Sequence, residues 1–120
     1  MKVLLDTNML LYAVAQKVDL QALMDGKELL TLQNCVAELE KLGKGKTRSG
    51  MHARVALELL KKKNIKVLQS GEKNTDRAII RYARDNNIIV ATNDRVLIKS
   101  LKTNGIRVIR LRQKRLLIEE

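Results

Sequence analysis

Four carboxylates in this 120-residue chain stand where a sheet of parallel strands would bind a ligand. Asp6 directly follows the first apolar run of the sequence, and Asp94 follows the fourth. Glu38 lies on the helical stretch after the second run, and Asp76 opens the helical stretch after the third. Ligands of such sheets lie beyond the carboxyl ends of the strands. These positions predict that the four carboxylates converge on one site.

A divalent cation held by oxygen is the chemistry that such a cluster favours. Carboxylates without cationic partners repel one another by several kcal/mol at the dielectric of a protein. The chain has one cysteine, Cys35, and one histidine, His52. This excludes a disulfide framework and a zinc finger within one chain. We therefore expect Mg²⁺ or Mn²⁺ as the cofactor, because both ions prefer oxygen ligands.

A structural role for each acid is the alternative. Asp76 could face a helix dipole from the first turn, and Asp94 could cap a helix. Glu38 could lie on a solvated helix face. Asp6 is harder to explain in this way, because a charge that closes an apolar strand is expensive to bury unless it is paired or bound to a metal.

The charge of the chain favours a polyanionic partner. It has 24 Lys and Arg residues against 13 Asp and Glu residues, which gives a net charge of +11. Residues 1–40 carry a net charge of −3, residues 41–66 of +8 and residues 67–120 of +6. Nucleic acid is the usual partner of such a protein, and solubility is the other use of the charge. An acidic metal site in a basic protein suits the hydrolysis of phosphodiester bonds.

The cations expected to contact nucleic-acid phosphates lie in and after residues 43–50, a segment without apolar side chains that is expected to be an exposed loop. They are Lys44, Lys46, Arg48 and Arg54. The alternative is that this loop is only solvated.

A second basic face could form from Arg77, Arg81 and Arg84, which recur at helical spacing. The two aromatic residues, Tyr12 and Tyr82, are expected in the core, which leaves no platform for stacking bases. Recognition of a base sequence is therefore not expected.

The elements that must position these residues form an α/β pattern. Short apolar runs at 3–5, 29–32, 65–68, 88–91 and 106–111 alternate with helical stretches, of which two are expected to be capped by Asn34 and Thr75. This alternation predicts a three-layer α/β/α sandwich with a central parallel five-stranded sheet. The expected domain covers residues 1–112, and residues 113–120 are expected to be a polar tail.

No apolar run approaches the roughly 18 residues that a membrane span needs. The first apolar stretch contains Lys2 and Asp6, unlike a signal peptide. We therefore expect a cytoplasmic protein.

Four segments resemble the motifs of the PIN domain family. They occur in the order and approximate spacing of that family and cover essentially the whole chain. They are Leu4-Leu5-Asp6-Thr7-Asn8, Val36-Ala37-Glu38-Leu39-Glu40-Lys41-Leu42, Asp76-Arg77-Ala78-Ile79 and Ile89-Val90-Ala91-Thr92-Asn93-Asp94-Arg95-Val96-Leu97. The chain looks most like small archaeal PIN proteins similar to the eukaryotic rRNA-processing Fcf-type factors, and less closely like VapC-type toxins.

The resemblance implies a metal-dependent endoribonuclease in which the first and fourth strands are adjacent. The four carboxylates match the family's catalytic and metal-binding quartet, with Glu40 as the alternative to Glu38. Asn8 and Thr92 match the polar residues that orient these ligands. RNA is then the substrate, an antitoxin or a ribosome-assembly protein is the possible partner, and a homodimer is expected. The alternatives are a toxin ribonuclease of a toxin–antitoxin pair and a non-catalytic RNA-binding or assembly factor.

Overall fold

Strands near both ends and in the middle of the chain form one mixed sheet. The computed structural model describes residues 1–119, and within this range the strand order is β3-β2-β1-β4-β5-β6. The strands are β1 (Lys2–Leu5), β2 (Glu28–Leu32), β3 (Lys66–Leu68), β4 (Ile89–Ala91), β5 (Val108–Arg112) and β6 (Arg115–Glu119). The helices are α1 (Thr7–Ala15), α2 (Leu20–Leu23), α3 (Gln33–Gly43), α4 (Arg48–Lys62), α5 (Thr75–Asn86) and α6 (Arg95–Thr103).

The first and fourth strands are neighbours, as the family resemblance implied. Leu4 of β1 is in parallel register with Leu30 of β2 on one side and with Val90 of β4 on the other. The strand order therefore reverses at β1 and β4, and the chain leaves both strands at the same edge of the sheet. This is the edge at which ligands of parallel sheets bind.

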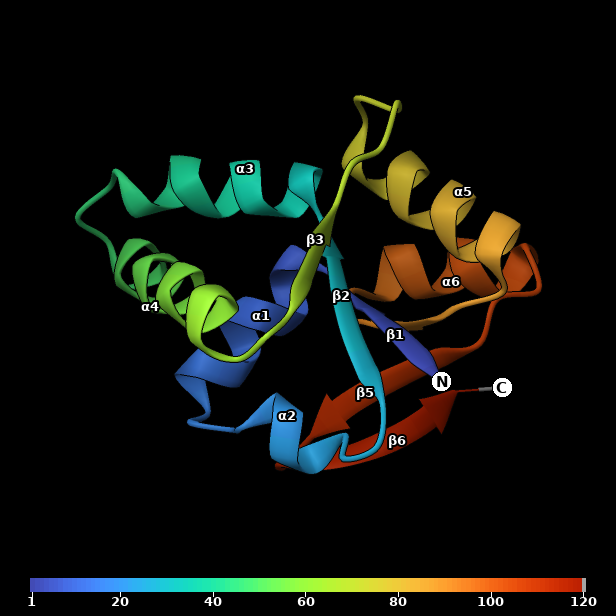
Figure 1. The fold of residues 1–120 in the computed structure, drawn as a ribbon, viewed down its shortest axis with the longest axis horizontal. Helices are drawn as coiled ribbons and strands as arrows, with labels where there is room; N and C mark the ends of the chain where they lie inside the picture. The colour runs from blue at the N-terminus through green and yellow to red at the C-terminus, as the bar shows by residue number, and fades with distance from the viewer. Residues whose placement is uncertain (120) are drawn as a thin grey trace.

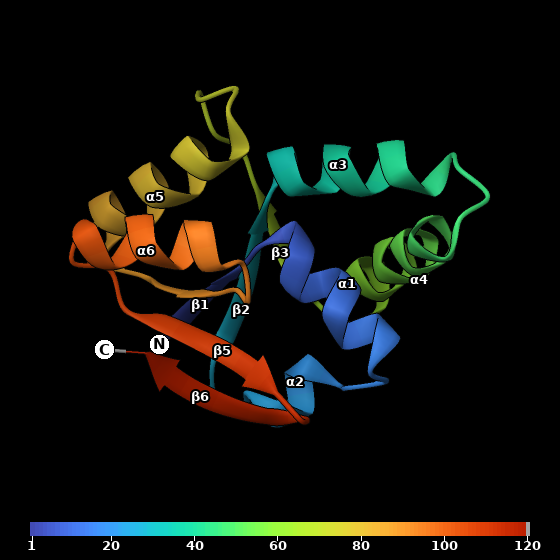
Figure 2. The same cartoon turned by 180° about the vertical axis from the view of Figure 1, so that it is seen from behind.

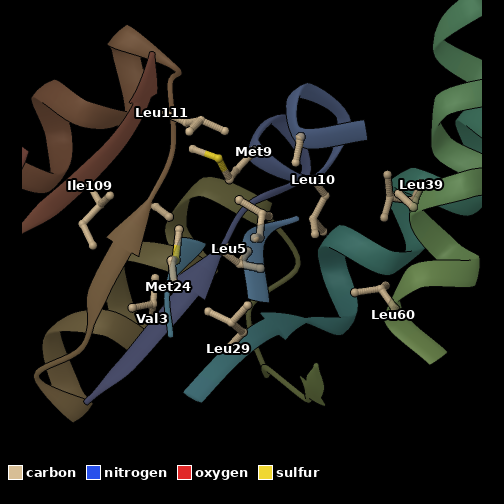
Figure 3. Close-up of a cluster of buried hydrophobic side chains, with 14 of the residues drawn as sticks. Val3, Leu5, Met9, Leu10, Met24, Leu29, Leu39, Leu60, Ile109 and Leu111 are labelled. Atoms are coloured by element: carbon tan, nitrogen blue, oxygen red, sulfur yellow. The ribbon is translucent and has the colours of Figure 1, made fainter. Parts of the chain in front are cut away.

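Helices cover both faces of the sheet, which confirms the three-layer sandwich (Figures 1 and 2). Side chains of a strand alternate between the two faces. Val3 and Leu5 therefore enter one core cluster with residues of α1, α2 and α4, some of which are labelled in Figure 3. Leu4 enters a second cluster, which α5 and α6 cover. The helix α3 lies across the carboxyl edge of the sheet and supplies Leu39 to the first cluster and Cys35 to the second.

The sheet has six strands among the described residues, whereas the sequence predicted five. The sixth, β6, pairs antiparallel with β5 inside the segment that was expected to be a polar tail after residue 112. Gln113 and Lys114 make the two-residue turn with φ angles of 49° and 62°. Turns of this kind favour Asn-Gly, so the Gln-Lys pair carries no turn signal. The apolar residues at 116–118 were the signal that could have found the strand.

Three local predictions at helix starts differ from the structure. The segment at 43–50 is a shorter connection than expected, because α3 reaches Gly43 and α4 begins at Arg48 with Thr47 as its N-cap. Asn34 lies inside α3, which begins directly after β2 without a side-chain cap. The N-cap of α5 is Asn74, one residue before the expected Thr75.

None of the helices found between residues 1 and 119 is both long enough and apolar enough to cross a membrane.

Candidate active site

The four predicted carboxylates line one pocket at the carboxyl edge of the sheet. The pocket has a volume of about 260 Å³ and lies where α1, α5 and α6 begin and where α3 passes over the edge. Its lining residues are Asp6, Thr7, Asn8, Leu11, Glu38, Thr75, Asp76, Ile79 and Asp94. Parallel strands with crossover helices place their carboxyl ends and the following helix starts on the same side, which explains the convergence.

Asp6 is the buried member of the group and is 5% exposed. It is the N-cap of α1, and the Met9 backbone N–H donates to its Oδ1 at 2.7 Å. The Thr92 hydroxyl donates to its Oδ2 at 2.5 Å, which joins the ends of β1 and β4. Burial raises the pKa of Asp6 from 3.8 to about 6, and the charges of Asp94 and Asp76 act in the same direction. The two hydrogen bonds oppose this increase but do not cancel it.

Two threonine hydroxyls hold Glu38 in the pocket, although its side chain is exposed. Thr7 at the start of α1 donates to Oε1 at 2.5 Å, and Thr75 at the start of α5 donates to Oε2 at 3.0 Å. Glu40 is exposed and is not among the residues that line the pocket. A separation of two residues corresponds to a rotation of about 200° around a helix, so Glu38 and Glu40 point in nearly opposite directions.

Asp76 and Asp94 occupy the starts of the two helices on the other face of the sheet. Asp94 is the N-cap of α6, where its Oδ1 accepts from the Leu97 N–H at 3.0 Å. The Thr92 hydroxyl accepts from the Asp94 N–H at 3.0 Å, so Thr92 contacts two of the site acids. Partial burial raises the pKa of Asp76, and so do the charges of Asp94 and Glu38. Asp94 therefore caps α6, as the structural alternative predicted, and it also lines the pocket.

Two asparagines fix the segments around the pocket. Asn34 Nδ2 donates to the carbonyl oxygens of Glu72 and Lys73 at 2.8 and 3.3 Å, which ties α3 to the segment before α5. The Asn93 side chain donates to the Leu111 carbonyl and accepts from the Leu111 N–H, both at 2.9 Å. It therefore pairs with β5 as a strand residue would and holds the segment that carries Asp94.

The sequence prediction missed both threonines that contact Glu38. Thr7 is adjacent to Asp6 in the motif at 4–8, and Thr75 was considered only as a helix cap. A hydroxyl next to each of two site acids was the available signal. Which acid a hydroxyl contacts depends on how α3 packs across the sheet edge, and this is not visible in the local sequence.

The predicted orienting and phosphate-contacting residues have different surroundings. Asn8 is exposed and lines the pocket. Lys44, Lys46 and Arg48 are exposed at the turn between α3 and α4, which projects away from the pocket along α3 (Figure 1). Arg54 Nη1 donates to the carbonyl oxygens of Gly43 and Gly45 at 2.6 and 3.0 Å, so this side chain also holds the turn together.

The four carboxylates of the pocket offer oxygen atoms, which hard divalent cations prefer as ligands. Within residues 1–119, no Lys or Arg forms an ion pair with any of the four carboxylates. Burial is the main cause of the raised pKa values of Asp6 and Asp76, and the charges of neighbouring carboxylates add to it. Among residues 1–119, no group of three or more Asp, Glu, His or Cys side chains is arranged so that it could hold a metal ion.

Comparisons with known proteins show the family of this chain. The model of the PIN like domain family matches residues 3–114, so the chain belongs to that family. It is also 37% identical over 121 aligned positions to a protein named ribonuclease VapC4 from Methanocaldococcus jannaschii, and the match covers 95% of this chain and 92% of that protein.

Solved structures of similar fold come from archaea and a bacterium. A domain of a functionally unknown protein from M. jannaschii matches with a TM-score of 0.67 and 24% identity, over 99% of this chain and 96% of that one. A PilT N-terminus domain protein from Sulfolobus solfataricus P2 matches with a TM-score of 0.64 and 14% identity, over 92% and 87%. A VapBC-1 structure from nontypeable Haemophilus influenzae matches with a TM-score of 0.61 and 18% identity, over 90% and 96%. At these identities the similarity describes the fold.

Proposed function

We propose that this protein is a metal-dependent endoribonuclease that hydrolyses RNA at the carboxylate pocket. The observation that carries the proposal is the convergence of four acids without cationic partners, within the described residues, in a chain of net charge +11. The 37% identity to a protein named ribonuclease VapC4 supports the same activity.

The four carboxylates, Asp6, Glu38, Asp76 and Asp94, would hold Mg²⁺ or Mn²⁺ directly or through water. When bound, the ion would supply a water of lowered pKa as the nucleophile and would neutralise charge on the phosphate. Thr92 keeps the Asp6 carboxylate in place through Oδ2, and Thr7 and Thr75 do the same for Glu38. Asn8, exposed at the pocket, can donate its amide N–H groups to a phosphate oxygen.

Cations at the turn between α3 and α4 would contact RNA phosphates beyond the pocket. Lys44, Lys46 and Arg48 are exposed and form no ion pair within residues 1–119. Arg54 would contribute with the part of its guanidinium that does not contact the turn. Such contacts attract the polyanion and hold it in register without reading its sequence.

The relatives favour a toxin role, in which a cognate antitoxin inhibits the ribonuclease. Both the ribonuclease VapC4 relative and the VapBC-1 structure carry names from that class. Processing of rRNA is the other role, and an RNA from the ribosome would then be the preferred substrate. We expect the protein to act as a homodimer, which analytical ultracentrifugation would test.

Cleavage of a structured RNA with Mn²⁺ or Mg²⁺ tests the activity. The substitutions Asp6→Asn and Asp94→Asn are each expected to lower the cleavage rate at least about 100-fold, which is about 2.7 kcal/mol in activation free energy. Asparagine is as good an N-cap as aspartate, so both variants keep the capping bonds of α1 and α6. EDTA is expected to abolish cleavage by the wild type.

Asp25→Asn is the matched control, because Asp25 is an exposed acid away from the pocket residues. It should cleave at the wild-type rate. Equal cleavage by all four proteins, or no cleavage with either metal, would contradict the nuclease. Salt-sensitive RNA binding without cleavage would instead support the non-catalytic RNA-binding factor.

A further inference from the structure

The outer surfaces of α5 and α6 carry two rows of cations that the site does not use. Residues three or four apart lie on the same side of a helix. The opposite sides of both helices are buried, through Ala78 and Ile79 in α5 and through Leu97 and Leu101 in α6. We call the exposed surface the α5–α6 basic face; its cations are Arg77, Arg81, Arg84, Arg95, Lys99 and Lys102.

This face keeps a clear excess of positive charge. The acid on it outside the pocket is Asp85, which lies 3.9 Å from Arg81 and 3.5 Å from Arg84. All three side chains are more than half exposed, so these ion pairs are weak. Arg77, Arg95 and Lys99 form no ion pair within residues 1–119, and α6 contains no acid.

The basic face begins at the carboxylate pocket. Arg77 directly follows Asp76, and Arg95 directly follows Asp94. The two helices lie side by side on one face of the sheet and lead away from the pocket (Figures 1 and 2). The turn between α3 and α4 lies at the far end of α3, on the other side of the pocket (Figure 1). Cations therefore flank the four carboxylates on two sides.

The side chains of the face suit phosphates rather than bases. Arginine and lysine contact phosphate oxygens, whereas bases of single strands stack on aromatic side chains. The aromatic residue of α5, Tyr82, is half-buried and packs against the second core cluster. No other aromatic residue lies in α5 or α6.

We propose that the α5–α6 basic face binds the phosphate backbone of the RNA on one side of the cleavage point and so aligns the strand across the pocket. Naming RNA as the polyanion rests on the nuclease function proposed above. An acidic protein is the competing occupant. The position of the face next to a site for phosphodiester cleavage favours the RNA.

RNA binding without cleavage tests the face separately from the activity. Fluorescence anisotropy of a labelled RNA in EDTA would compare the wild type with the triple variant Arg77→Gln, Arg95→Gln, Lys99→Gln. The matched control is Lys17→Gln, Lys61→Gln, Lys62→Gln, which removes the same charge from exposed positions on α4 and after α1. Thermal unfolding of all three proteins checks that the exposed substitutions leave the fold intact.

The triple variant is expected to weaken RNA binding at least about tenfold at low salt. It should also lower the slope of log K against log salt by about 2 to 3, because each lost phosphate contact removes roughly one unit of slope. The control is expected to change the slope by less than about one unit. An equal loss in both variants would mean that only total charge matters and would overturn the proposal.

Three further outcomes separate the possibilities. If the wild type bound polyglutamate more tightly than RNA and the triple variant lost this binding, the face would bind an acidic protein. This result would overturn the proposal. RNA binding lost only in the triple variant supports the face even if no metal produces cleavage, in which case the nuclease function alone fails. If the triple variant bound RNA with wild-type affinity and cleaved it, the proposed role of the face would be wrong. The proposed nuclease function would be unaffected.

Discussion

Asp6 carries a charge in a place where burial makes that charge unfavourable. Its pKa is about 6 in the folded protein against 3.8 for an unperturbed aspartate. Between these values the folded state binds more protons than the unfolded state, so the free energy of unfolding falls as the pH rises from about 4 to about 6. Above this range the loss is constant, at up to about 3 kcal/mol.

The substitution Asp6→Asn removes this charge and keeps an acceptor for the Met9 N–H. Urea unfolding in EDTA should show the variant about 1 to 3 kcal/mol more stable than the wild type at pH 7, with the difference disappearing near pH 4. Mn²⁺ should then stabilise the wild type and not the variant, because only the wild type keeps the full set of ligands. A difference in stability that does not change with pH would contradict this explanation.

Thr75 is a positioning residue for Glu38. Its hydroxyl donates to Oε2 at 3.0 Å, whereas the cap of α5 is supplied by Asn74. Thr75→Val keeps the shape of the side chain and removes the donor. We expect a roughly 3- to 30-fold loss of cleavage rate, equivalent to about 0.7 to 2 kcal/mol, with the stability changed by less than about 1 kcal/mol.

Thr75→Ser is the control for that prediction, because it restores the hydroxyl and should recover most of the rate. A merely structural role would instead lower the stability in both variants. Equal activity of the valine and serine variants would show that this hydrogen bond does not matter for Glu38.

At the scale of elements, the helices α3 and α4 approach each other closely at Gly50. A Cβ at Gly50 would lie 2.5 Å from the Gly45 carbonyl oxygen and 2.8 Å from that of Leu42. Alanine favours a helix over glycine by about 1 kcal/mol. Forcing backbone atoms apart costs about 1 to 3 kcal/mol or more. The steric term should therefore decide the outcome.

Gly50→Ala is expected to lower the free energy of unfolding by up to about 2 kcal/mol in chemical denaturation. Gly71→Ala is the matched control, because a Cβ at Gly71 would meet no atom within 4 Å and the φ of this residue is not positive. If Gly50→Ala were more stable than the wild type, the turn would move away from the added Cβ without an energetic penalty, and the prediction would be wrong. The turn carries Lys44 and Lys46, so the destabilised variant should also bind RNA more weakly.

At the scale of the molecule, opposite charges are kept in separate places. The four site acids gather at the carboxyl edge of the sheet, while cations cover α5, α6 and the turn after α3. Long-range attraction favours the approach of a polyanion, and the four carboxylates have no Lys or Arg ion-pair partner within residues 1–119. The net charge of +11 and the acidic pocket are therefore complementary parts of one proposed function.

Much of the fold could be predicted from the sequence, because the signals for it are local. Apolar runs followed by amphipathic stretches predicted the first five strands and the main helices, and Asp6, Glu38, Asp76 and Asp94 were predicted to converge because each lies at a strand end or on the helix that follows. The strand β6 was missed because a turn with positive φ at Gln113 and Lys114 has no glycine or asparagine to mark it.

The residue types alone show which chemistry is available: oxygen ligands, abundant cations, one histidine and one cysteine. Which of these groups contact one another depends on the packing of the chain. Hydrogen bonds from Thr7 and Thr75 to Glu38 and from Thr92 to Asp6 span 31, 37 and 86 residues of the chain. Such contacts depend on strand order and on how α3 packs over the sheet edge, as does the raised pKa of Asp6. The physical reason is that burial and long-range hydrogen bonds belong to the packed molecule, whereas periodicity and residue type belong to the local chain.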